Sequence, residues 1–366
     1  LTTSYGSTVY IETGDESDRY YYVHLGYLTG LSKDTTYHYR FVATDERSNT
    51  IYSSDKTLTS ATPSGTVVYI PGSMGSPQYT LDSANTTYIV TEDIDADYTA
   101  FKIAADNVTL DLGGHTITYN KTDYQVSGTG YDYATSSAVG VRISGTQTGA
   151  KIVNGKIIQG EGYNSASSGS YGYSPIWSVN STSSGEVAGI SADYIGEQIT
   201  GMSLTYDFDA HHNVIKDRGM GMINRHQGCD AITKAKSAYN NLVKRVRHRG
   251  LFKTGPIYHN EVWGDSWWTN AHLIQATSNT NVYSNHVFGG GYTVVGIVTN
   301  GSDYSRTYNT SKYLKNVDVY DNFVYLYSVR VYDDRSAEYG PHSSGFMGRC
   351  MWGADNIEWY DNILVG

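Results

Sequence analysis

The triplet of tyrosine, any residue and asparagine recurs through the second half of this 366-residue chain and constrains its fold more than any other feature. Each copy is followed within two residues by Val, Leu or Ile. The copies are Tyr239–Asn241, Tyr258–Asn260, Tyr283–Asn285, Tyr320–Asn322 and Tyr360–Asn362. Successive asparagines are 19, 25, 37 and 40 residues apart. The two short spacings match one solenoid coil of three short strands and three turns, about 20–25 residues. The two long spacings fit either one coil with an extended loop or two coils.

An asparagine at the same corner of every coil has a physical use. The bend between two sheets leaves backbone groups without partners and favours a residue in the left-handed conformation. Asparagine tolerates that conformation, and its amide can bond along the stack of coils. We therefore expect the asparagines to take the left-handed conformation and to line up on one corner. His212-Asn213-Val214 and Val153-Asn154-Gly155 are earlier, weaker members of the series.

From Thr66 onward, strands of three to six residues follow one another without a helical apolar period of useful length, which is typical of a solenoid. The strongest signal is the run Asn107-Val-Thr-Leu-Asp-Leu-Gly-Gly-His-Thr-Ile117. Alternation with period two points Val108, Leu110 and Leu112 inward, and Gly113-Gly114 turns the corner. This run resembles the N-terminal coils of pectin-lyase-like proteins. The resemblance implies an all-β fold, a right-handed parallel β-helix (solenoid) over residues 66–366.

Residues 1–62 follow a different pattern, with alternating strands joined by polar turns. The segment Leu28–Arg40 resembles the tyrosine-corner region of fibronectin type III domains, in which a tyrosine hydroxyl bonds back to the backbone. About 60 residues is too few for a seven-strand sandwich of about 100 residues. We therefore expect a partial fibronectin type III-like β-sandwich at 1–62, cut from a longer parent chain, and a linker at 63–65.

The bulk properties exclude two classes of partner. The formal net charge of −10 opposes general binding to nucleic acid, because the phosphate backbone would repel most of the surface. The most apolar stretches fall far short of the roughly 20 residues that a bilayer helix needs. Cys229 and Cys350 form either a disulfide or two separate buried thiols, so they do not decide the compartment. An extracellular or cell-surface location is what the resemblance implies.

Ionisable residues are densest between Asp207 and Lys253. In an extended strand, Asp207, Asp209 and His211 share one face, which suits a metal site, with Ca²⁺ as the candidate ion, or an acid/base group. The alternative is a solvated strand edge.

A basic stripe is the second candidate. If Arg225 and His226 recur one coil before Arg247 and His248, with Arg249 adjoining, these side chains stack and could hold a uronate or a sulfated sugar. A Lys, Arg or His beside a neutralised carboxylate can also abstract the C5 proton of a uronate. The alternative is a ladder of ion pairs along the solenoid surface.

Tryptophans form the third candidate. Trp263, Trp267 and Trp268 lie beside Glu261 and Asp265, which suits a sugar-binding platform next to a pair of carboxylates. The alternative is that these rings fill the core or cover a loop. An enzyme should bring His226, Arg247, His248 and Asp265 within a few ångströms of one another in a cleft, with Arg225, Arg249 and the tryptophans binding the substrate.

The catalytic signatures of β-helix enzymes do not carry over. Of the polygalacturonase-like pattern only Asp333-Asp334 fits, with His342-Ser343 after it and no earlier Asn-Thr-Asp triplet. The Arg-x-Pro-x-x-Arg segment of pectate lyases and the Asp-Pro-His motif of mannuronan epimerases are absent. The resemblance therefore implies a fold and not a particular reaction.

Three functions from different classes remain. One of them is a receptor-binding fibre of a phage or symbiont, for which trimer-forming segments are expected and none is evident in the sequence. The other two are as follows. The first is a secreted or cell-surface protein that interacts with a polysaccharide or cell-surface glycan, as a binder, a polysaccharide lyase or a glycoside hydrolase. The second is a structural or adhesive protein, a stiff spacer or a filament subunit that contacts copies of itself.

Overall fold

The structure is a computed structural model that describes most of the chain. The described residues are 26–28, 31–45, 47–60, 63, 65–72, 74–75, 77–121, 138–160, 174–178, 180–194, 200–218, 230–246, 248–266, 271–291, 294–298, 314–327, 344–347 and 354–365. Every regular element within these ranges is a β-strand.

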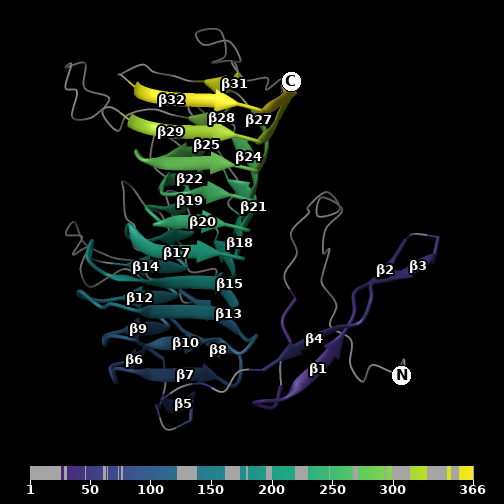
Figure 1. Cartoon of the computed structure of the whole chain (residues 1–366). Coiled ribbons are helices and arrows are strands. Elements are labelled where there is room, and N and C mark those ends of the chain that lie inside the picture. Colours follow the sequence, from purple (N-terminus) through teal and green to yellow (C-terminus); the bar gives the residue numbers. More distant parts are fainter. Residues whose placement is uncertain are drawn as a thin grey trace.

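From Thr66 onward the strands form an all-β parallel solenoid, which confirms the predicted fold class (Figure 1). Its coils run through three faces in chain order. The first and second faces together form a 19-stranded sheet, because β13 and β15 run continuously around the corner between them. The third face is a separate 10-stranded sheet. Pairing between successive coils is parallel throughout both sheets.

Each face is a column of short strands. The first face contains β5 (Thr66–Ile70), β7 (Thr86–Val90), β10 (Thr109–Asp111), β13 (Ala150–Gln159), β15 (Ser184–Tyr194), β17 (Asp207–His211), β20 (Ser237–Tyr239), β23 (Ile257–Tyr258), β26 (Thr280–Tyr283), β29 (Leu314–Tyr320) and β32 (Ala354–Tyr360). The second face contains β8 (Ile94–Asp95), β11 (Thr116–Tyr119), the second halves of β13 and β15, β18 (Val214–Asp217), β21 (Leu242–Val246), β24 (Glu261–Ser266), β27 (His286–Gly291), β30 (Phe323–Tyr327) and β33 (Ile363–Val365). The third face contains β6 (Tyr79–Leu81), β9 (Phe101–Ile103), β12 (Val141–Ile143), β14 (Ile176–Ser178), β16 (Met202–Ser203), β19 (Asp230–Thr233), β22 (Arg249–Thr254), β25 (Ala271–Ala276), β28 (Val294–Val298) and β31 (Ser344–Met347).

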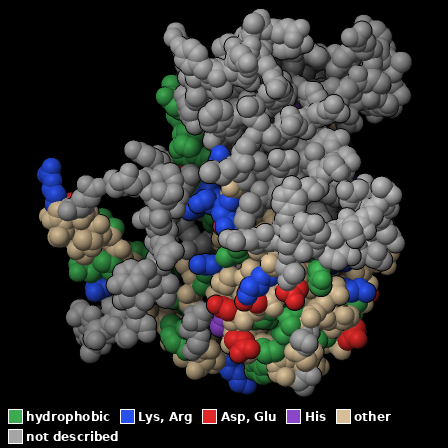
Figure 2. Space-filling model, turned by 180° about the vertical axis from the view of Figure 1, so that it is seen from behind, with side chains coloured by type: hydrophobic (Ala, Val, Ile, Leu, Met, Phe, Trp, Pro, Cys, Tyr) green, Lys and Arg blue, Asp and Glu red, His purple; other side chains and the backbone are tan. Residues whose placement is uncertain are grey.

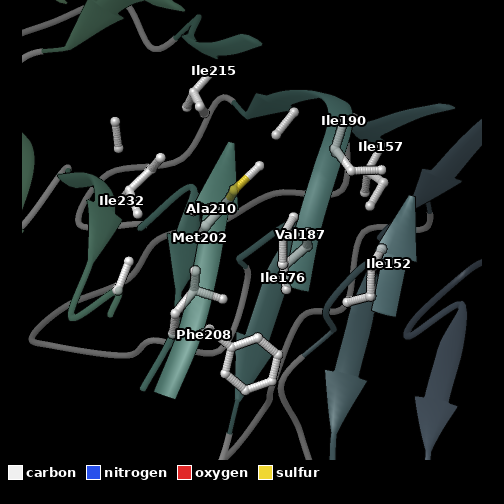
Figure 3. Close-up of a cluster of buried hydrophobic side chains, with 14 of the residues drawn as sticks. Ile152, Ile157, Ile176, Val187, Ile190, Met202, Phe208, Ala210, Ile215 and Ile232 are labelled. Carbon is white, nitrogen blue, oxygen red and sulfur yellow. The ribbon is translucent and has the colours of Figure 1, made fainter. Parts of the chain in front are cut away.

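The core is a set of aliphatic columns that run along the solenoid axis. Alternation points every second residue inward, and parallel register places equivalent residues of successive coils in contact. One column contains Leu110, Ile152, Val187, Ala210, Ala238, Ile257, Val282 and Val319, all fully buried. Figure 3 shows the middle coils, with Ile152, Val187 and Ile190 among the side chains that meet in the interior. Val108 and Leu112 are buried as the alternation predicts.

The corner between the first and second faces carries a ladder of side-chain amides, buried in every member except the last. Its members, which we call the amide ladder, are Asn213, Asn241, Asn260, Asn285, Asn322 and Asn362. The Nδ2 of Asn260 donates to Oδ1 of Asn285 at 3.0 Å and to the carbonyl of Ala238 at 2.9 Å. Its Oδ1 accepts from the backbone N–H of Asn241 at 3.0 Å. Each amide therefore satisfies backbone groups that the turn would leave unpaired. The predicted alignment of the amides on one corner is confirmed.

The left-handed residue of the repeat is not the asparagine, and that part of the prediction is wrong. The residue before each asparagine takes positive φ instead, for example His259 at 54° and Asp321 at 52°. The asparagine itself must keep its side chain pointing into the corner to bond its neighbours. Asn154 has φ 58° and lies beside Gly189 in the register, so it occupies the left-handed position and does not belong to the buried ladder.

Each of the two long spacings spans a single coil and not two. Asn285 bonds Asn322 across 37 residues, and Asn322 bonds Asn362 across 40 residues, so these asparagines lie in adjacent coils. A second, exposed amide ladder lies where the first face begins, at Asn279 just before β26, Asn316 in β29 and Asn356 in β32. Asn316 donates to Asn279 at 2.8 Å, and Asn356 donates to Asn316 at 3.0 Å. There the asparagines do take positive φ.

The N-terminal segment forms two antiparallel pairs beside the solenoid (Figure 1). β1 (Thr36–Tyr39) pairs with β4 (Lys56–Thr59), and β2 (Val42–Thr44) pairs with β3 (Thr50–Tyr52). The Tyr27 hydroxyl donates to the carbonyl of Gly155 at 2.8 Å, which ties this segment to β13.

Candidate functional site

The first site is a cluster on the third face, formed by Asp230, His248, Arg249, Phe252 and Lys253; we call it the His248–Arg249 cluster. Asp230 begins β19 and pairs with Arg249, which begins β22. The Oδ1 of Asp230 lies 2.7 Å from Nε of Arg249 and 3.2 Å from Nδ1 of His248. The Arg249 guanidinium carbon lies 3.5 Å from the centroid of the Phe252 ring. The carboxylate and the ring together fix the direction of the guanidinium group.

Positive charge exceeds negative charge in this cluster. Burial alone would raise the pKa of the Asp230 carboxyl, but the hydrogen bond from His248 and the charge of Arg249 outweigh burial and lower it. Burial and the charges of Arg249 and Lys234 lower the pKa of Lys253. Among the described residues, no carboxylate forms an ion pair with Lys234 or Lys253. Figure 2 shows Lys and Arg side chains gathered at mid-height on the face that it presents.

Only part of the predicted basic stripe can be located. Of the catalytic set, His248 is placed, and it meets the predicted binding residue Arg249 on a shared carboxylate. Arg225 and His226, between β18 and β19, and Arg247, between β21 and β22, lie outside the described residues. Asp265 belongs to β24, where its backbone pairs with Gly290, but its side chain lies outside the description.

The tryptophan platform is described for one ring. Trp263 donates from Nε1 to Oε1 of Glu261 at 2.6 Å, and its ring stacks on Phe288 with centroids 4.2 Å apart. One face of the ring is therefore covered by the next coil. Trp267 and Trp268 lie outside the described residues, as do Cys229 and Cys350.

The second site is an open recess of about 420 Å³ on the first face, which we call the first-face groove. Lys151 of β13, Glu186 of β15, Asp209 and His211 of β17 and Tyr239 of β20 line it. Gly149 and Gly185 also line the groove. The register places Lys151, Glu186 and Asp209 in one column of outward side chains.

A chain of hydrogen bonds crosses the groove. Glu186 accepts from Nζ of Lys151 at 2.9 Å, and its Oε1 lies 3.0 Å from Nε2 of His211. The Nδ1 of His211 lies 2.9 Å from Nδ1 of His212. The hydrogen bond from Lys151 outweighs the effect of burial on Glu186, and the charges of Lys151 and His211 add to it, so the pKa of Glu186 is lowered. Glu186 is therefore ionised at neutral pH.

The predicted metal ligands share one outward face, as alternation requires. Asp207 is exposed, and Asp209 and His211 are partly buried. Asp209 accepts a hydrogen bond from Oγ of Ser237 at 2.6 Å and faces Nζ of Lys236 at 3.5 Å. Within the part of the chain that the structure describes, no three His, Cys, Asp or Glu side chains are grouped to hold a metal ion.

A stack of tyrosine rings continues from the groove along the first face. The tyrosine ladder consists of the first residues of the repeated triplet, Tyr239, Tyr258, Tyr283, Tyr320 and Tyr360. Successive centroids are 4.9, 5.0, 5.1 and 5.0 Å apart, with ring planes within 4° of parallel. His211 extends the stack by one ring, 4.6 Å from Tyr239.

Several of these residues carry no signal in the sequence. Lys151 and Glu186 are far apart along the chain, and only the register of β13 and β15 brings them side by side in the groove. Asp230 adjoins the predicted stripe in the sequence, but only the pairing of β19 with β22 places it opposite Arg249.

The fold defines the class of the protein as an all-β parallel solenoid. The chain matches no protein-family model, no curated protein and no solved structure. In the described part of the chain there is no helix of the length and apolarity that would cross a bilayer.

Proposed function

We propose that this protein is an extracellular or cell-surface β-helix that binds an acidic polysaccharide through the His248–Arg249 cluster. The observation that carries the proposal is the excess of cations around the buried Asp230. Arg249, Lys234 and Lys253 are close enough for Arg249 and Lys234 to lower the pKa of Lys253. Like charges crowded on a chain with net charge −10 favour an anionic ligand, which would relieve their repulsion.

Arg249 supports recognition of a carboxylate or sulfate. Its Nε is held by Asp230 and its plane lies over Phe252, so the guanidinium group is oriented before a ligand arrives. His248 is held by the same carboxylate, an arrangement that fixes the direction of an imidazole in acid/base catalysis. Lys253, with its lowered pKa, is a candidate base for removing the C5 proton of a uronate in a lyase reaction.

The direct test is titration with a uronate polymer, a sulfated glycan and a neutral glucan. Arg249→Ala and Lys253→Gly should each weaken binding of the anionic polymers about tenfold or more, since hydrogen bonds to charged groups contribute roughly 1.5–3 kcal/mol. Glycine at 253 keeps the positive φ of that residue, 52°. Lys315→Ala, on the first face, is the matched loss of one positive charge. Equal weakening in all three variants, or no binding of any acidic polymer, would contradict the proposal.

Lyase activity is measured in the same samples, by the absorbance of unsaturated uronate products. If acidic polymers bind without an increase in absorbance or in reducing ends, the protein is a binder and not an enzyme.

A resemblance to known modules is also part of the proposal. We infer that the solenoid is a pectin-lyase-like β-helix and that the N-terminal segment derives from a fibronectin type III module. The support for the module is a tyrosine-corner contact, in which the Tyr37 hydroxyl accepts from the backbone N–H of Ser32 at 2.7 Å. Tyr37→Phe should loosen β1 and β4 without affecting the solenoid, as measured by hydrogen exchange.

A second candidate is a non-catalytic structural or adhesive role. The amide and tyrosine ladders continue through successive coils, and such ladders would make the solenoid a stiff spacer. If Arg249→Ala and Lys253→Gly leave all polysaccharide interactions unchanged, this second function is the better account.

A further inference from the structure

The first face differs from the third face in charge. Carboxylates surround the tyrosine ladder along its length: Glu186 and Asp209 near Tyr239, and Asp318 and Asp321 near Tyr320. Burial, the neighbouring Tyr258, Asp209 and Glu186 all raise the pKa of Tyr239. Lys151 and Lys236 pair with Glu186 and Asp209, but among the described residues no cation pairs with Asp318 or Asp321. The potential is therefore negative around Tyr320, and a polyanion would be repelled there.

The tyrosine ladder exposes ring edges and not ring faces. Each inner ring is sandwiched between parallel neighbours about 5 Å away, so no sugar can stack on it. The rings are parallel, so neighbouring hydroxyl groups are spaced like the rings and cannot bond to one another. Among the described residues, the hydroxyls of Tyr239, Tyr258 and Tyr283 have no hydrogen-bond partner. These groups are available to a ligand outside the protein.

The spacing of the hydroxyl groups selects the shape of that ligand. One hydroxyl per coil recurs at about the spacing of parallel strands, 4.7–4.9 Å. A pyranose unit in an extended β-1,4-linked chain is close to this length, so one sugar unit falls opposite each ring of the ladder. Successive units are turned over, so they present alternating edges to the hydroxyl groups. A chain that coils, such as an α-1,4-linked glucan, would move out of register after a few units.

The first-face groove provides a place for one end of such a chain. Glu186 and Asp209 offer acceptors for sugar hydroxyl groups, and Lys151 offers a donor. Gly149 and Gly185 contribute only backbone to the lining of the recess. The ladder continues from Tyr239 at its edge.

We propose that the first face binds a linear, uncharged, β-1,4-linked polysaccharide, with its sugar units along the tyrosine ladder and one end in the first-face groove. This ligand differs from the acidic polymer of the third face, and the two sites do not depend on each other. The third face would hold charged chains and the first face neutral ones.

The test uses cellohexaose, xylohexaose and mannohexaose as probes, with maltohexaose as the coiled control, in calorimetric titrations of the full chain. At least one of the β-linked probes should bind, and maltohexaose should bind at least tenfold more weakly. The triple variant Tyr239→Phe, Tyr258→Phe and Tyr283→Phe keeps the ring stack and removes the three hydroxyl groups that have no partner among the described residues. It should weaken binding at least tenfold.

Three single variants test whether the neutral chain lies on the first face. Tyr52→Phe and Arg249→Ala are the controls, and Glu186→Gln tests the groove. Tyr52→Phe, in the N-terminal segment, should leave the affinity unchanged. Glu186→Gln should weaken binding if the groove holds the chain end. Arg249→Ala should not affect the neutral probes, even if it abolishes binding of uronate polymers. The proposal is overturned if none of the β-linked probes binds, if maltohexaose binds as tightly, or if the triple variant binds like the parent.

Discussion

The Nδ1 atom of His211 lies 2.9 Å from the Nδ1 atom of His212, so two imidazole rings share one hydrogen bond. Only one of the two atoms can carry the proton. Asn240 donates from Nδ2 to Nε2 of His212 at 3.2 Å, which places the His212 proton on Nδ1. His211 then accepts at Nδ1 and donates from Nε2 to Glu186. Both rings are neutral in this arrangement.

The histidine pair makes the fold sensitive to acid. Burial lowers the pKa of His212, and a positive charge on His211, once that ring is protonated, lowers it further. A group whose pKa is lower in the folded state stabilises the fold above its unfolded pKa, here about 6.5, and loses that contribution as the pH falls through the folded value. Urea unfolding should therefore show a loss of stability between about pH 7.5 and about pH 5. The loss should be smaller in His212→Asn.

The asparagine replacement suits this position because His212 has φ 54°, a conformation that asparagine tolerates, and the next coil has Asn240 there. Ser284→Asn, at the equivalent turn of a later coil, is the control and should keep the pH dependence of the parent. If His212→Asn loses as much stability in acid as the parent does, the pair is not the source of the effect.

Removing one rung of the amide ladder should be costly. Asn260→Ala leaves the backbone carbonyl of Ala238, the N–H of Asn241 and the amide of Asn285 short of partners in a buried corner. Each unsatisfied buried group costs roughly 1–3 kcal/mol, so we expect a loss of at least about 2 kcal/mol in the free energy of unfolding.

Asn316→Gly, in the exposed amide ladder, is the comparison for that variant. It removes an amide but keeps the positive φ of 54°, and solvent can replace the lost bonds. Its cost should stay below about 1 kcal/mol. Equal costs in chemical denaturation would show that burial of the ladder does not matter.

The tyrosine ladder should stabilise the fold through its rings and not through its hydroxyl groups. Tyr283 stacks on Tyr258 and on Tyr320, with centroids 5.0 and 5.1 Å away. Tyr283→Ala removes both contacts and should cost about 1–3 kcal/mol, at roughly 0.5–1.5 kcal/mol for each pair. Tyr283→Phe should leave the midpoint of thermal unfolding nearly unchanged. A large loss in the phenylalanine variant would mean that the hydroxyl has a structural role.

Replacing Lys253 should raise the stability of the fold and weaken the binding of acidic polymers. Its φ is 52°, a conformation that is unfavourable for residues other than glycine. Its ammonium group also lies near two other cations, Arg249 and Lys234. Lys253→Gly should therefore raise the free energy of unfolding by about 1 kcal/mol. The same variant should bind uronate polymers more weakly. Calorimetric unfolding with and without ligand measures both effects, and a variant that gains stability and keeps full affinity would exclude Lys253 from the site.

The sequence predicted the parts of the fold that depend on local periodicity. Period-two alternation placed Val108, Leu110 and Leu112 in the core, and the repeated triplet located the corner of the amide ladder. It assigned the left-handed conformation to the wrong residue, because both the asparagine and the residue before it are compatible with positive φ. The asparagine side chain must bond to the asparagines of neighbouring coils, so the residue before it takes the positive φ.

The repeat spacing alone determined that equivalent residues recur once per coil, because a stack of coils buries a continuous core only when the same pattern returns. Which side chains meet across coils was decided by tertiary structure. Loops of different lengths separate the strands, so the distance along the chain does not give the register. Lys151, Glu186 and Asp209 became neighbours only when parallel pairing aligned β13, β15 and β17.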